Sequence, residues 1–293
     1  MRVAFQGIHG AFSEVAARSM LGSAATTFPC ETFEEVFDAV ERGRAHRGVL
    51  PIENSLTGSI HQNYDLLLHR RVHILGERHL RIEHVLGAHP RTSFARLRRV
   101  RSHPQALAQC AQFLRRHPSL TVEPYFDTAG AARSITDSDD PETAAISGAY
   151  AAKLYGLRIL RRNLEDRATN FTRFLLVGRT PRQPQRKGPM KSSIVFRPQR
   201  NQPGILFRIL GVFSLRDIDL VKIESRPDPE AAFDYLFYLD FMGDPAEERV
   251  ARALDHLQEV VVSYRLLGTY PADRRDRRSL RRTRGATGGH SAD

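Results

Sequence analysis

The first 178 residues alternate short apolar runs with amphipathic stretches, and this alternation constrains the fold more than any other feature of the sequence. Arg2 to Gln6 is a predicted strand, and Ser13 to Leu21 is a predicted helix. Thr32 and Glu35 have the spacing of a capping box, so a second helix is predicted from there to about Arg42. Repeated β-α units of this kind predict mostly parallel sheets with ligands bound at the strand ends.

The same alternation continues through the rest of this region. The predicted elements are strands at 48–52, near 100, at 120–125, at 144–146 and at 174–177, and helices at 103–116, from Thr128 capped by Asp127, and from Ser147. Chains with this many units often form two lobes, and the interface between two lobes is a common ligand site. We therefore expect an α/β domain with a cleft.

The pattern changes after a stretch rich in proline and arginine. Strands are predicted at 192–196, 220–225, 235–242 and 264–268, with helices that begin at Pro203-Gly204 and at Pro245. The resulting βαββαβ order is that of a ferredoxin-like unit. The predicted boundaries are 1–178 for the first domain, 179–190 for a linker, 191–270 for the second domain and 271–293 for a basic disordered tail.

A net charge of +11 raises the question of a nucleic-acid partner. Seven arginines and three aspartates lie in the tail from Pro271 onward, and charge blocks of this kind are usually disordered and solvated. We therefore expect no nucleic-acid partner. Cys30 and Cys110, the two cysteines, are interpreted as buried thiols of a reducing compartment. No apolar run approaches the roughly 18 residues of a membrane-spanning helix, and no secretory signal is recognised, so a cytoplasmic protein with no membrane partner is predicted.

Three polar clusters lie where predicted strands end, which is where open α/β sheets bind ligands. They are residues 51–55 with Thr57 and Gly58, residues 101–105, and residues 170–174. Gln105 and Gln109 are four residues apart and so share a helix face. The histidines show no grouping with metal-ligand spacing, so no metal site is predicted.

With these clusters in view, the chain resembles a monofunctional prephenate dehydratase from its start to about residue 270. Five segments carry the resemblance, in order: Phe5-Gln6-Gly7 with Gly10-Ala11-Phe12-Ser13, Pro51-Ile52-Glu53-Asn54-Ser55, Ser102-His103-Pro104-Gln105-Ala106-Leu107, Asp127-Thr128-Ala129 and Asn170-Phe171-Thr172-Arg173-Phe174. In the second domain, Glu224-Ser225-Arg226-Pro227 matches the phenylalanine-binding loop of the ACT amino-acid-binding module.

The resemblance implies a fold and a set of functional residues. The fold is a two-lobed catalytic domain similar to type II periplasmic binding proteins, followed by a ferredoxin-like βαββαβ ACT domain. The implied catalytic residues are Thr172, Glu53, Asn54, Ser102 and Gln109. The expected substrate-binding residues are Ser55, Gln105, Thr128, Asn170, Arg173 and Phe174. The expected allosteric residues are Gly204, Ile205, Leu206, Glu224, Ser225, Arg226 and Pro227.

The implied reaction is the decarboxylating dehydration of prephenate to phenylpyruvate, with L-phenylalanine as a feedback effector. Prephenate loses carbon dioxide and water together and gains an aromatic ring, so the reaction depends on positioning more than on a strong acid. Thr172 is then a hydrogen-bond donor to the departing hydroxyl, and Arg173 a bidentate partner for a carboxylate. No cofactor is expected, and the family resemblance implies a homodimer or homotetramer.

Several alternatives remain open at this point. Thr172 taken alone also fits an ordinary strand-entry threonine, and Glu53 can pair with an arginine instead of the substrate. Ser102 is the better expected cap for the helix that begins near His103. Among functions, the alternatives are an arogenate dehydratase, a non-catalytic amino-acid sensor, and a nucleic-acid-associated regulator. The bulky Ile205, where the family's loop usually reads Gly-Ala-Leu, leaves the effector open as well.

Overall fold

The computed structural model describes residues 1–138, 140–181, 188–199, 203–228, 230–231 and 234–273. The chain divides into two compact units, Met1–Leu66 with Arg78–Leu176, and Leu67–Glu77 with the chain from Val177 onward. Most of the predicted tail, from residue 274, and residues 182–187 of the predicted linker lie outside the described residues. Within the described ranges, no helix is long and apolar enough to cross a membrane.

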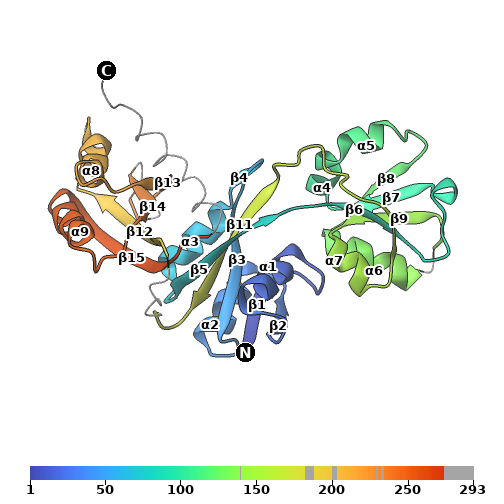
Figure 1. Ribbon diagram of the computed structural model, residues 1–293, viewed down its shortest axis with the longest axis horizontal. Helices are drawn as coiled ribbons and strands as arrows, with labels where there is room; N and C mark the ends of the chain where they lie inside the picture. The colour runs from blue at the N-terminus through green and yellow to red at the C-terminus, as the bar shows by residue number, and fades with distance from the viewer. Residues whose placement is uncertain (139, 182–187, 200–202, 229, 232–233, 274–293) are drawn as a thin grey trace, which may run out of the picture. The chain divides into compact units, whose positions relative to one another are not determined.

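The first lobe is a sheet in the strand order β2-β1-β3-β11-β5, with the short β4 paired to β3 (Figure 1). Its strands are β1 (Arg2–Gln6), β2 (Thr26–Cys30), β3 (Arg47–Asn54), β4 (Gly58–Ser59), β5 (His73–Arg81) and β11 (Phe171–Gly178). Its helices are α1 (Phe12–Leu21), α2 (Phe33–Glu41) and α3 (His61–His69). The pairs β1·β2 and β1·β3 are parallel, as β-α alternation predicts.

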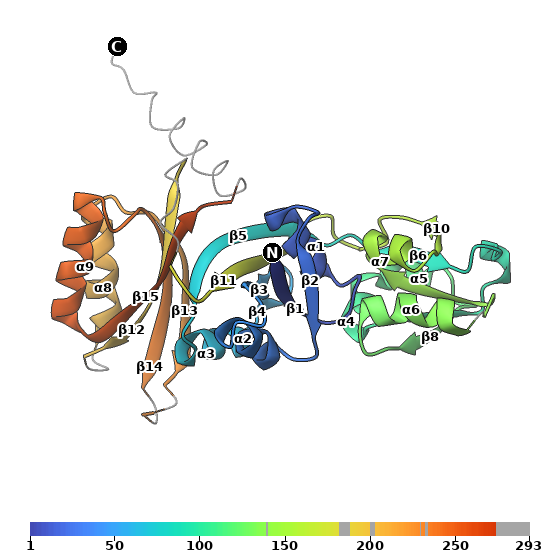
Figure 2. The same cartoon turned by 90° about the horizontal axis from the view of Figure 1, so that it is seen from below.

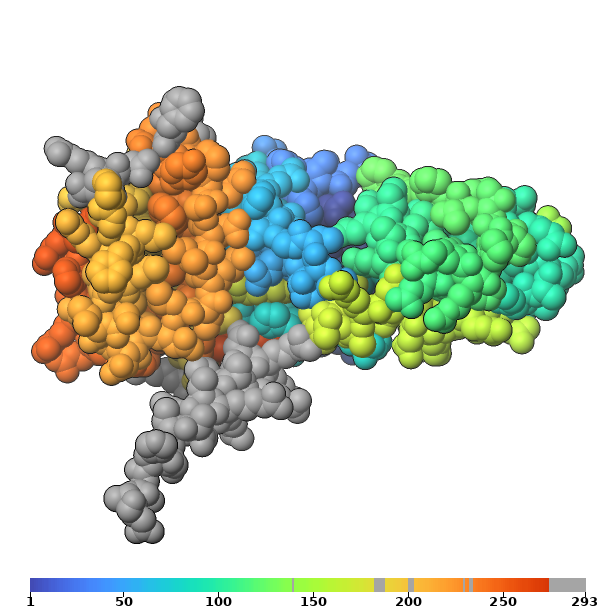
Figure 3. Space-filling view, turned by 90° about the horizontal axis from the view of Figure 1, so that it is seen from above, coloured from blue at the N-terminus to red at the C-terminus, as the bar shows by residue number. Residues whose placement is uncertain are grey.

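The second lobe repeats this arrangement with the strand order β10-β6-β9-β7-β8. Its strands are β6 (Val85–Ala88), β7 (Arg99–Ser102), β8 (Thr121–Pro124), β9 (Thr143–Ser147) and β10 (Arg158–Arg161). Its helices are the 3₁₀ turn η1 (Phe94–Arg96), α4 (Pro104–Gln109), α5 (Ala111–Arg115), α6 (Thr128–Ser138) and α7 (Ala149–Leu154). The space-filling view shows this lobe, coloured teal to yellow-green, as one continuous body (Figure 3). The predicted two-lobed α/β fold is confirmed.

The capping box at the start of α2 is confirmed in its main feature. The Thr32 side chain accepts a hydrogen bond from the Glu35 N–H at 3.2 Å. The Glu35 carboxylate reaches back to the N–H of Glu31 at 2.9 Å, one residue before the position expected for a capping box. Both bonds satisfy backbone donors that have no partner inside the helix, so the sequence determines where α2 begins.

The single helix predicted over 103–116 is wrong, because α4 and α5 are separated at Cys110. Asp166 accounts for the break. Its N–H donates to the carbonyl of Gln109 at 2.7 Å, and its carboxylate accepts from the N–H of Gln112 at 3.0 Å. Both groups would otherwise pair within one continuous helix, so a contact distant in sequence interrupts it.

Two predicted helix caps are also wrong. The cap of α4 is His103, whose Nδ1 accepts from the N–H of Gln105 at 3.2 Å. The Ser102 hydroxyl instead donates to the carbonyl of Ile146 at 2.6 Å. Ser147 belongs to β9, and Gly148 precedes α7. In both cases a serine expected at a helix start is buried within the sheet, because the strand extends further than its apolar run suggested.

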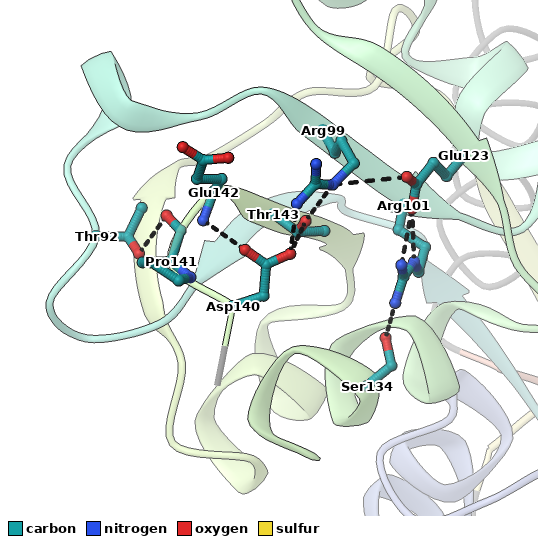
Figure 4. Close-up of polar contacts among 9 residues, drawn as sticks. All are labelled: Thr92, Arg99, Arg101, Glu123, Ser134, Asp140, Pro141, Glu142 and Thr143. Atoms are coloured by element: carbon teal, nitrogen blue, oxygen red, sulfur yellow. Dashed lines mark hydrogen bonds and ion pairs between the residues drawn. The ribbon is translucent and has the colours of Figure 1, made fainter. Parts of the chain in front are cut away.

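Charged side chains link the outer strands of the second lobe (Figure 4). Arg101 donates to Glu123 on β8 at 2.8 Å, and Arg99 donates to Asp140 at 2.8 Å. The Thr143 hydroxyl donates to Asp140 at 2.6 Å, and this bond, with that from Arg99, lowers the pKa of the Asp140 carboxyl to about 2. The network therefore stabilises this edge of the sheet while Asp140 is ionised.

The second unit contains an antiparallel sheet in the order β13-β14-β12-β15, with two helices on one face (Figures 1 and 2). Its elements are β12 (Met190–Pro198), α8 (Ile205–Ser214), β13 (Leu220–Pro227), β14 (Tyr235–Met242), α9 (Glu248–Val260) and β15 (Val261–Pro271). The core between sheet and helices includes Ile194, Phe196, Phe213, Leu239 and Phe241. The predicted ferredoxin-like βαββαβ unit is confirmed.

The other face of this sheet carries buried polar side chains that contact residues 67–77 of the same unit. Lys191 is 2% exposed and its ammonium lies 2.9 Å from the Glu77 carboxylate. Arg265 donates to the backbone carbonyls of residues 67, 68, 70 and 72, around the end of α3. Cationic side chains are favoured there because carbonyls at a helix C-terminus lack partners within the helix.

Candidate active site

A cavity of about 250 Å³ lies between the two lobes of the first unit. The predicted site residues that line it are Asn54, Gln105, Gln109, Thr128, Thr172 and Phe174. They come from β3, α4, α6 and β11, so both lobes contribute to the lining. The predicted residues Glu53, Ser55, Ser102, Asn170 and Arg173 are not part of the cavity lining.

Thr172 and Asn54 meet on the neighbouring strands β11 and β3. The Asn54 Nδ2 donates to the Thr172 Oγ1 at 3.0 Å and to the Asn170 Oδ1 at 2.9 Å. Because Thr172 accepts this bond on its oxygen, its own hydroxyl hydrogen is available to a group in the cavity. Thr172 is 8% exposed, so most of its surface is covered by protein.

The loop after β3 determines the orientation of the Asn54 amide. The Asn54 Oδ1 accepts from the N–H of Leu56 at 2.9 Å and from the N–H of Thr57 at 3.2 Å. Since backbone N–H groups can only donate, the carbonyl oxygen of the amide must face the loop, and the Nδ2 must face Thr172. The hydrogen bonds thus leave one assignment of the amide.

Arg173 and Glu53 lie on the opposite faces of β11 and β3 from Thr172 and Asn54, because successive side chains in a strand alternate. The Arg173 guanidinium is 3.6 Å from the Glu53 carboxylate and only 4% exposed. The expectation that Arg173 binds a substrate carboxylate is not matched by this geometry. Of the two roles left open for Glu53, the structure contains the ion pair with an arginine.

Three other predicted residues, outside the cavity lining, form hydrogen bonds with neighbouring backbone or side chains. The Ser55 hydroxyl accepts from the N–H of Phe171 at 2.9 Å and donates to the carbonyl of Thr169 at 2.7 Å, so both of its functions are engaged with backbone. The Asn170 Nδ2 donates to the Gln109 Oε1 at 2.9 Å. The buried Ser102 hydroxyl bonds within the second-lobe sheet, as described above. Both serine hydroxyls thus donate to backbone carbonyls outside the cavity lining, and their contact with a ligand stays a prediction.

One of the hydrogen bonds between the lobes joins α4 to the loop after β3. The Gln105 Nε2 on α4 donates to the Thr57 Oγ1 in the loop between β3 and β4, at 3.1 Å. Gln105 is the second residue of α4, and its side chain extends from the second lobe to the first. A ligand between the lobes would meet both groups.

The lining also contains residues that were not predicted as site residues. They are Phe12, Ser13, Pro51, Thr57, Ile60, Ile82, His84, His103 and Ala106. Most of them belong to segments whose motifs were noted in the sequence. His84 does not, because it lies between β5 and β6, two strands that the apolar pattern did not predict. Nothing in the sequence alone marks this histidine.

The chemistry of the cavity is that of neutral hydrogen-bonding groups. The described lining residues include two histidines, His84 and His103, and none is a carboxylate. Burial lowers the pKa of His84. Within the described residues, no cluster of His, Cys, Asp and Glu has the geometry of a metal site. Such a cavity favours a reaction driven by positioning and by hydrogen bonds to a departing group.

The residues predicted for an effector site fall into two segments of the second unit. Gly204 precedes α8 with a φ of 80°, a conformation that favours glycine. Ile205 lines a cavity of about 120 Å³, and Leu206 follows it in the first turn. Glu224, Ser225, Arg226 and Pro227 form the end of the edge strand β13.

These two segments do not share that cavity. Its lining consists of Arg197, Pro198, Gln199, Ile205, Asp234, Tyr235, Phe237 and Val262. Glu224 is close to Lys222, with 3.3 Å between carboxylate and ammonium, and the side chain of Ser225 is exposed. Within one chain, therefore, the cavity beside Ile205 does not join the two halves of the predicted effector site.

Comparisons with known proteins identify the class of this chain. Residues 3–182 match the family model "Prephenate dehydratase", and residues 199–259 match the model "ACT domain". The chain belongs to the prephenate dehydratase family. It is 47% identical over 282 residues to "Arogenate dehydratase/prephenate dehydratase 2, chloroplastic" of Arabidopsis thaliana, covering 93% of this chain and 73% of the relative.

Two solved structures are also similar over nearly the whole chain. The prephenate dehydratase of Arthrobacter aurescens in complex with L-Phe has a TM-score of 0.84 and 33% identity, covering 92% of this chain and 90% of that one. A protein described as GqqA, a novel type of quorum quenching acylases, has a TM-score of 0.86 and 37% identity, covering 94% of this chain and 100% of that one.

The cytoplasmic location predicted from the sequence is contradicted by the relatives. The Arabidopsis relative above is named chloroplastic, and so are three further relatives from the same plant, each 44% identical to this chain. The prediction depended on the absence of a recognisable signal, and such an absence does not define a compartment.

Proposed function

We propose that this protein converts prephenate into phenylpyruvate, carbon dioxide and water as a step of L-phenylalanine biosynthesis. The observation that carries the proposal is the hydrogen bond from the Asn54 Nδ2 to the Thr172 Oγ1 at 3.0 Å, which leaves the threonine hydrogen free at the cavity. The catalytic domain is assigned to residues 1–178, the linker to 179–190 and the ACT domain to 191–270, within the family shown above.

The reaction can be followed bond by bond. The bond between the ring and one carboxylate breaks, and its electron pair moves into the ring. The bond between the ring and its hydroxyl breaks on the opposite side, and the departing oxygen takes a proton that comes from solvent by way of the Thr172 hydroxyl. A donor aimed at the departing oxygen stabilises the charge that develops as this bond breaks, typically by about 10²- to 10³-fold in rate. Thr172 acts here as a donor and proton relay and never as a strong acid.

The rest of the cavity suits a ring that carries two anionic groups. Phe174 and Phe12 provide apolar surface for the ring. Thr128, the first residue of α6, provides a hydroxyl donor for an anionic group in the cavity. Gln105 supplies another donor. Arg173 lies on the face of β11 away from the cavity, where its positive charge is paired with the Glu53 carboxylate.

The test of this function is an assay with two substrates. Purified protein is incubated with prephenate or with arogenate, and phenylpyruvate is measured by its absorbance in alkali while phenylalanine is measured by chromatography. The proposal predicts phenylpyruvate from prephenate. Product from arogenate alone would reassign the protein as an arogenate dehydratase, and no product from either substrate would favour the amino-acid sensor.

L-Phenylalanine is proposed as a feedback effector that binds at paired ACT domains of a homodimer or homotetramer. The apolar side chains of Val221 and Ile223 on the edge strand β13 are 39% and 41% exposed, and Phe207 on α8 is 81% exposed. Exposed apolar side chains on the edge strand β13 and on α8 favour burial against a second copy. Pairing would bring Ser225 of one chain and Gly204 of another within reach of one ligand.

Reciprocal binding tests the effector proposal. Phenylalanine should weaken the binding of prephenate, and prephenate should weaken the binding of phenylalanine by the same factor, because linkage is symmetric. Such couplings are usually about 5- to 150-fold. Gly204→Val should abolish the effect, since valine is strained at a φ of 80°, while Gly211→Ala within α8 should preserve it. No phenylalanine binding by calorimetry would reject the effector.

A further inference from the structure

His84 is a buried histidine of the cavity lining to which the proposed reaction assigns no role. It is 2% exposed, and its ring packs edge-on against the ring of Phe12, with centroids 5.8 Å apart. Its backbone is held on both sides, because its N–H donates to the Glu165 carboxylate at 2.9 Å and its carbonyl accepts from Leu164 at 3.0 Å. The ring is therefore fixed in place.

A chain of side-chain hydrogen bonds connects this ring to the proposed proton donor. The His84 Nε2 lies 3.2 Å from the Gln109 Oε1, which also accepts from the Asn170 Nδ2 at 2.9 Å. The Asn170 Oδ1 accepts from the Asn54 Nδ2, and Asn54 donates to Thr172. These hydrogen bonds thus lead from the segment between β5 and β6, through Gln109 of the second lobe, to β11 and β3 of the first lobe.

The donor and acceptor roles along these hydrogen bonds follow from Asn54, the residue that contacts Thr172. The backbone after β3 fixes the Nδ2 of Asn54 as the donor, so the atom of Asn170 that faces it must be the acceptor Oδ1. The Nδ2 of Asn170 then donates to the Oε1 of Gln109. Because that oxygen can only accept, the nitrogen of His84 that faces it must carry a hydrogen. A hydrogen on the Nε2 of His84 therefore gives every hydrogen bond in the chain one donor and one acceptor.

We infer that His84 is a positioning residue for the dehydration, which at one end of the chain of amides, with the loop after β3 at the other end, holds Gln109 and Asn170 in the orientation in which Asn54 donates to Thr172. In this role its Nε2 carries the hydrogen and its Nδ1 does not. The inference deepens the proposed function. The Nδ1 is buried without a hydrogen-bond partner among the described residues, which agrees with a ring that uses only its other nitrogen. Burial also lowers the pKa of His84, so the neutral ring is favoured.

If His84 were replaced by an apolar residue, Gln109 would lose a donor and could rotate by half a turn. Asn170 would then face an NH₂ group, and its own reversal would only move the conflict, because its NH₂ group would meet the Nδ2 of Asn54, which the loop after β3 keeps as a donor. The donation from Asn54 to Thr172 would be disturbed, although neither residue had been changed. Small misplacements of this kind at a distance from the reacting atoms cost up to about 10²-fold in rate.

A matched pair of variants tests the inference. Glutamine places its NH₂ group near the position of Nε2, whereas asparagine places it near the position of Nδ1. His84→Gln should keep kcat within a few-fold of wild type, while His84→Asn and His84→Leu should lower kcat by about 10- to 10²-fold with KM nearly unchanged. Equal activity of the Gln and Asn variants, or losses of kcat that follow their melting temperatures, would overturn it.

A second measurement is independent of turnover. Nitrogen NMR of protein with labelled histidine should show His84 as the neutral form with its hydrogen on Nε2, identified by the loss of its signals in His84→Gln. A hydrogen on Nδ1 instead would overturn the inference whatever the activity. An inactive wild type with a correct His84 signal would instead reject the proposed function, so the two failures can be told apart.

Discussion

The side chains of Asn54 and Thr172, 118 residues apart in the sequence, are joined by a hydrogen bond of 3.0 Å in which the amide donates and the hydroxyl accepts. The two residues are close in space because β3 and β11 are neighbouring strands in the first-lobe sheet. Because the Thr172 oxygen accepts this bond, its hydrogen is available to a group in the cavity. The proposed chemistry depends on this direction more than on any titration.

Asn54→Asp tests the direction of that bond. Aspartate has nearly the same shape and can still accept from the N–H groups of Leu56 and Thr57, but its carboxylate cannot donate to Thr172. The threonine hydrogen would then bond to the introduced carboxylate rather than to the substrate. We expect kcat to fall by about 10²- to 10³-fold with little change in KM. A variant within a few-fold of wild type would show that the donation is not required.

Gly268 is expected to be intolerant of any side chain. A Cβ at this position would overlap the backbone carbonyl oxygen of Ile74 in the same unit, and backbone cannot move aside as a flexible side chain can. Gly268→Ala should therefore destabilise the protein by at least about 1–3 kcal/mol in denaturant unfolding. The control is Gly211→Ala in α8, which meets nothing within 4 Å and should stabilise by up to about 1 kcal/mol. Equal stabilities of the two variants would contradict this packing.

Asp140 gives the second lobe a stability that depends on pH. Its pKa is about 2 in the folded protein against an ordinary value of 3.8, first through the bond from Thr143 and then through that from Arg99. A lowered pKa means that the contribution is present above about pH 4 and is lost as the pH falls toward 2.

Melting curves across that range test the assignment. Asp140→Asn should lower Tm at pH 7 and should reduce the fall in Tm between pH 4 and pH 2. Asp137→Asn is the control, because Asp137 pairs with Arg133 at an exposed position and its side chain is 63% exposed. Exposed pairs contribute about 0–1 kcal/mol, so this variant should follow wild type. An identical pH dependence for wild type and Asp140→Asn would contradict the role of the Asp140 network.

The parts of the fold that the sequence predicts are those determined by local chemistry. The capping box of Thr32 and Glu35 and the cap of Asp127, which accepts from the N–H of Gly130 at 2.7 Å, involve residues within a few positions of one another. Their outcome does not depend on the rest of the chain. The βαββαβ order of the second unit was predictable for the same reason, since each element has a clear apolar period.

The parts that the sequence does not predict are those determined by partners far along the chain. Asp166 interrupts the helix at Cys110, and nothing near residue 110 indicates it. Arg173 is next to Thr172 in the sequence but points to the other face of β11, where Glu53 pairs with it. The family motif therefore marks a strand that lines the cavity, and strand alternation decides which of its side chains reach that cavity.

The central claim is that the Thr172 hydroxyl donates to the departing group, and the most direct measurement is kcat for prephenate with Thr172→Val and Thr172→Ser. Valine keeps the shape of threonine without the hydroxyl, and serine keeps the hydroxyl without the methyl group. The account predicts that kcat falls by about 10²- to 10³-fold in the valine variant with KM nearly unchanged, and that serine retains most of the activity. Near-normal turnover in Thr172→Val would contradict it.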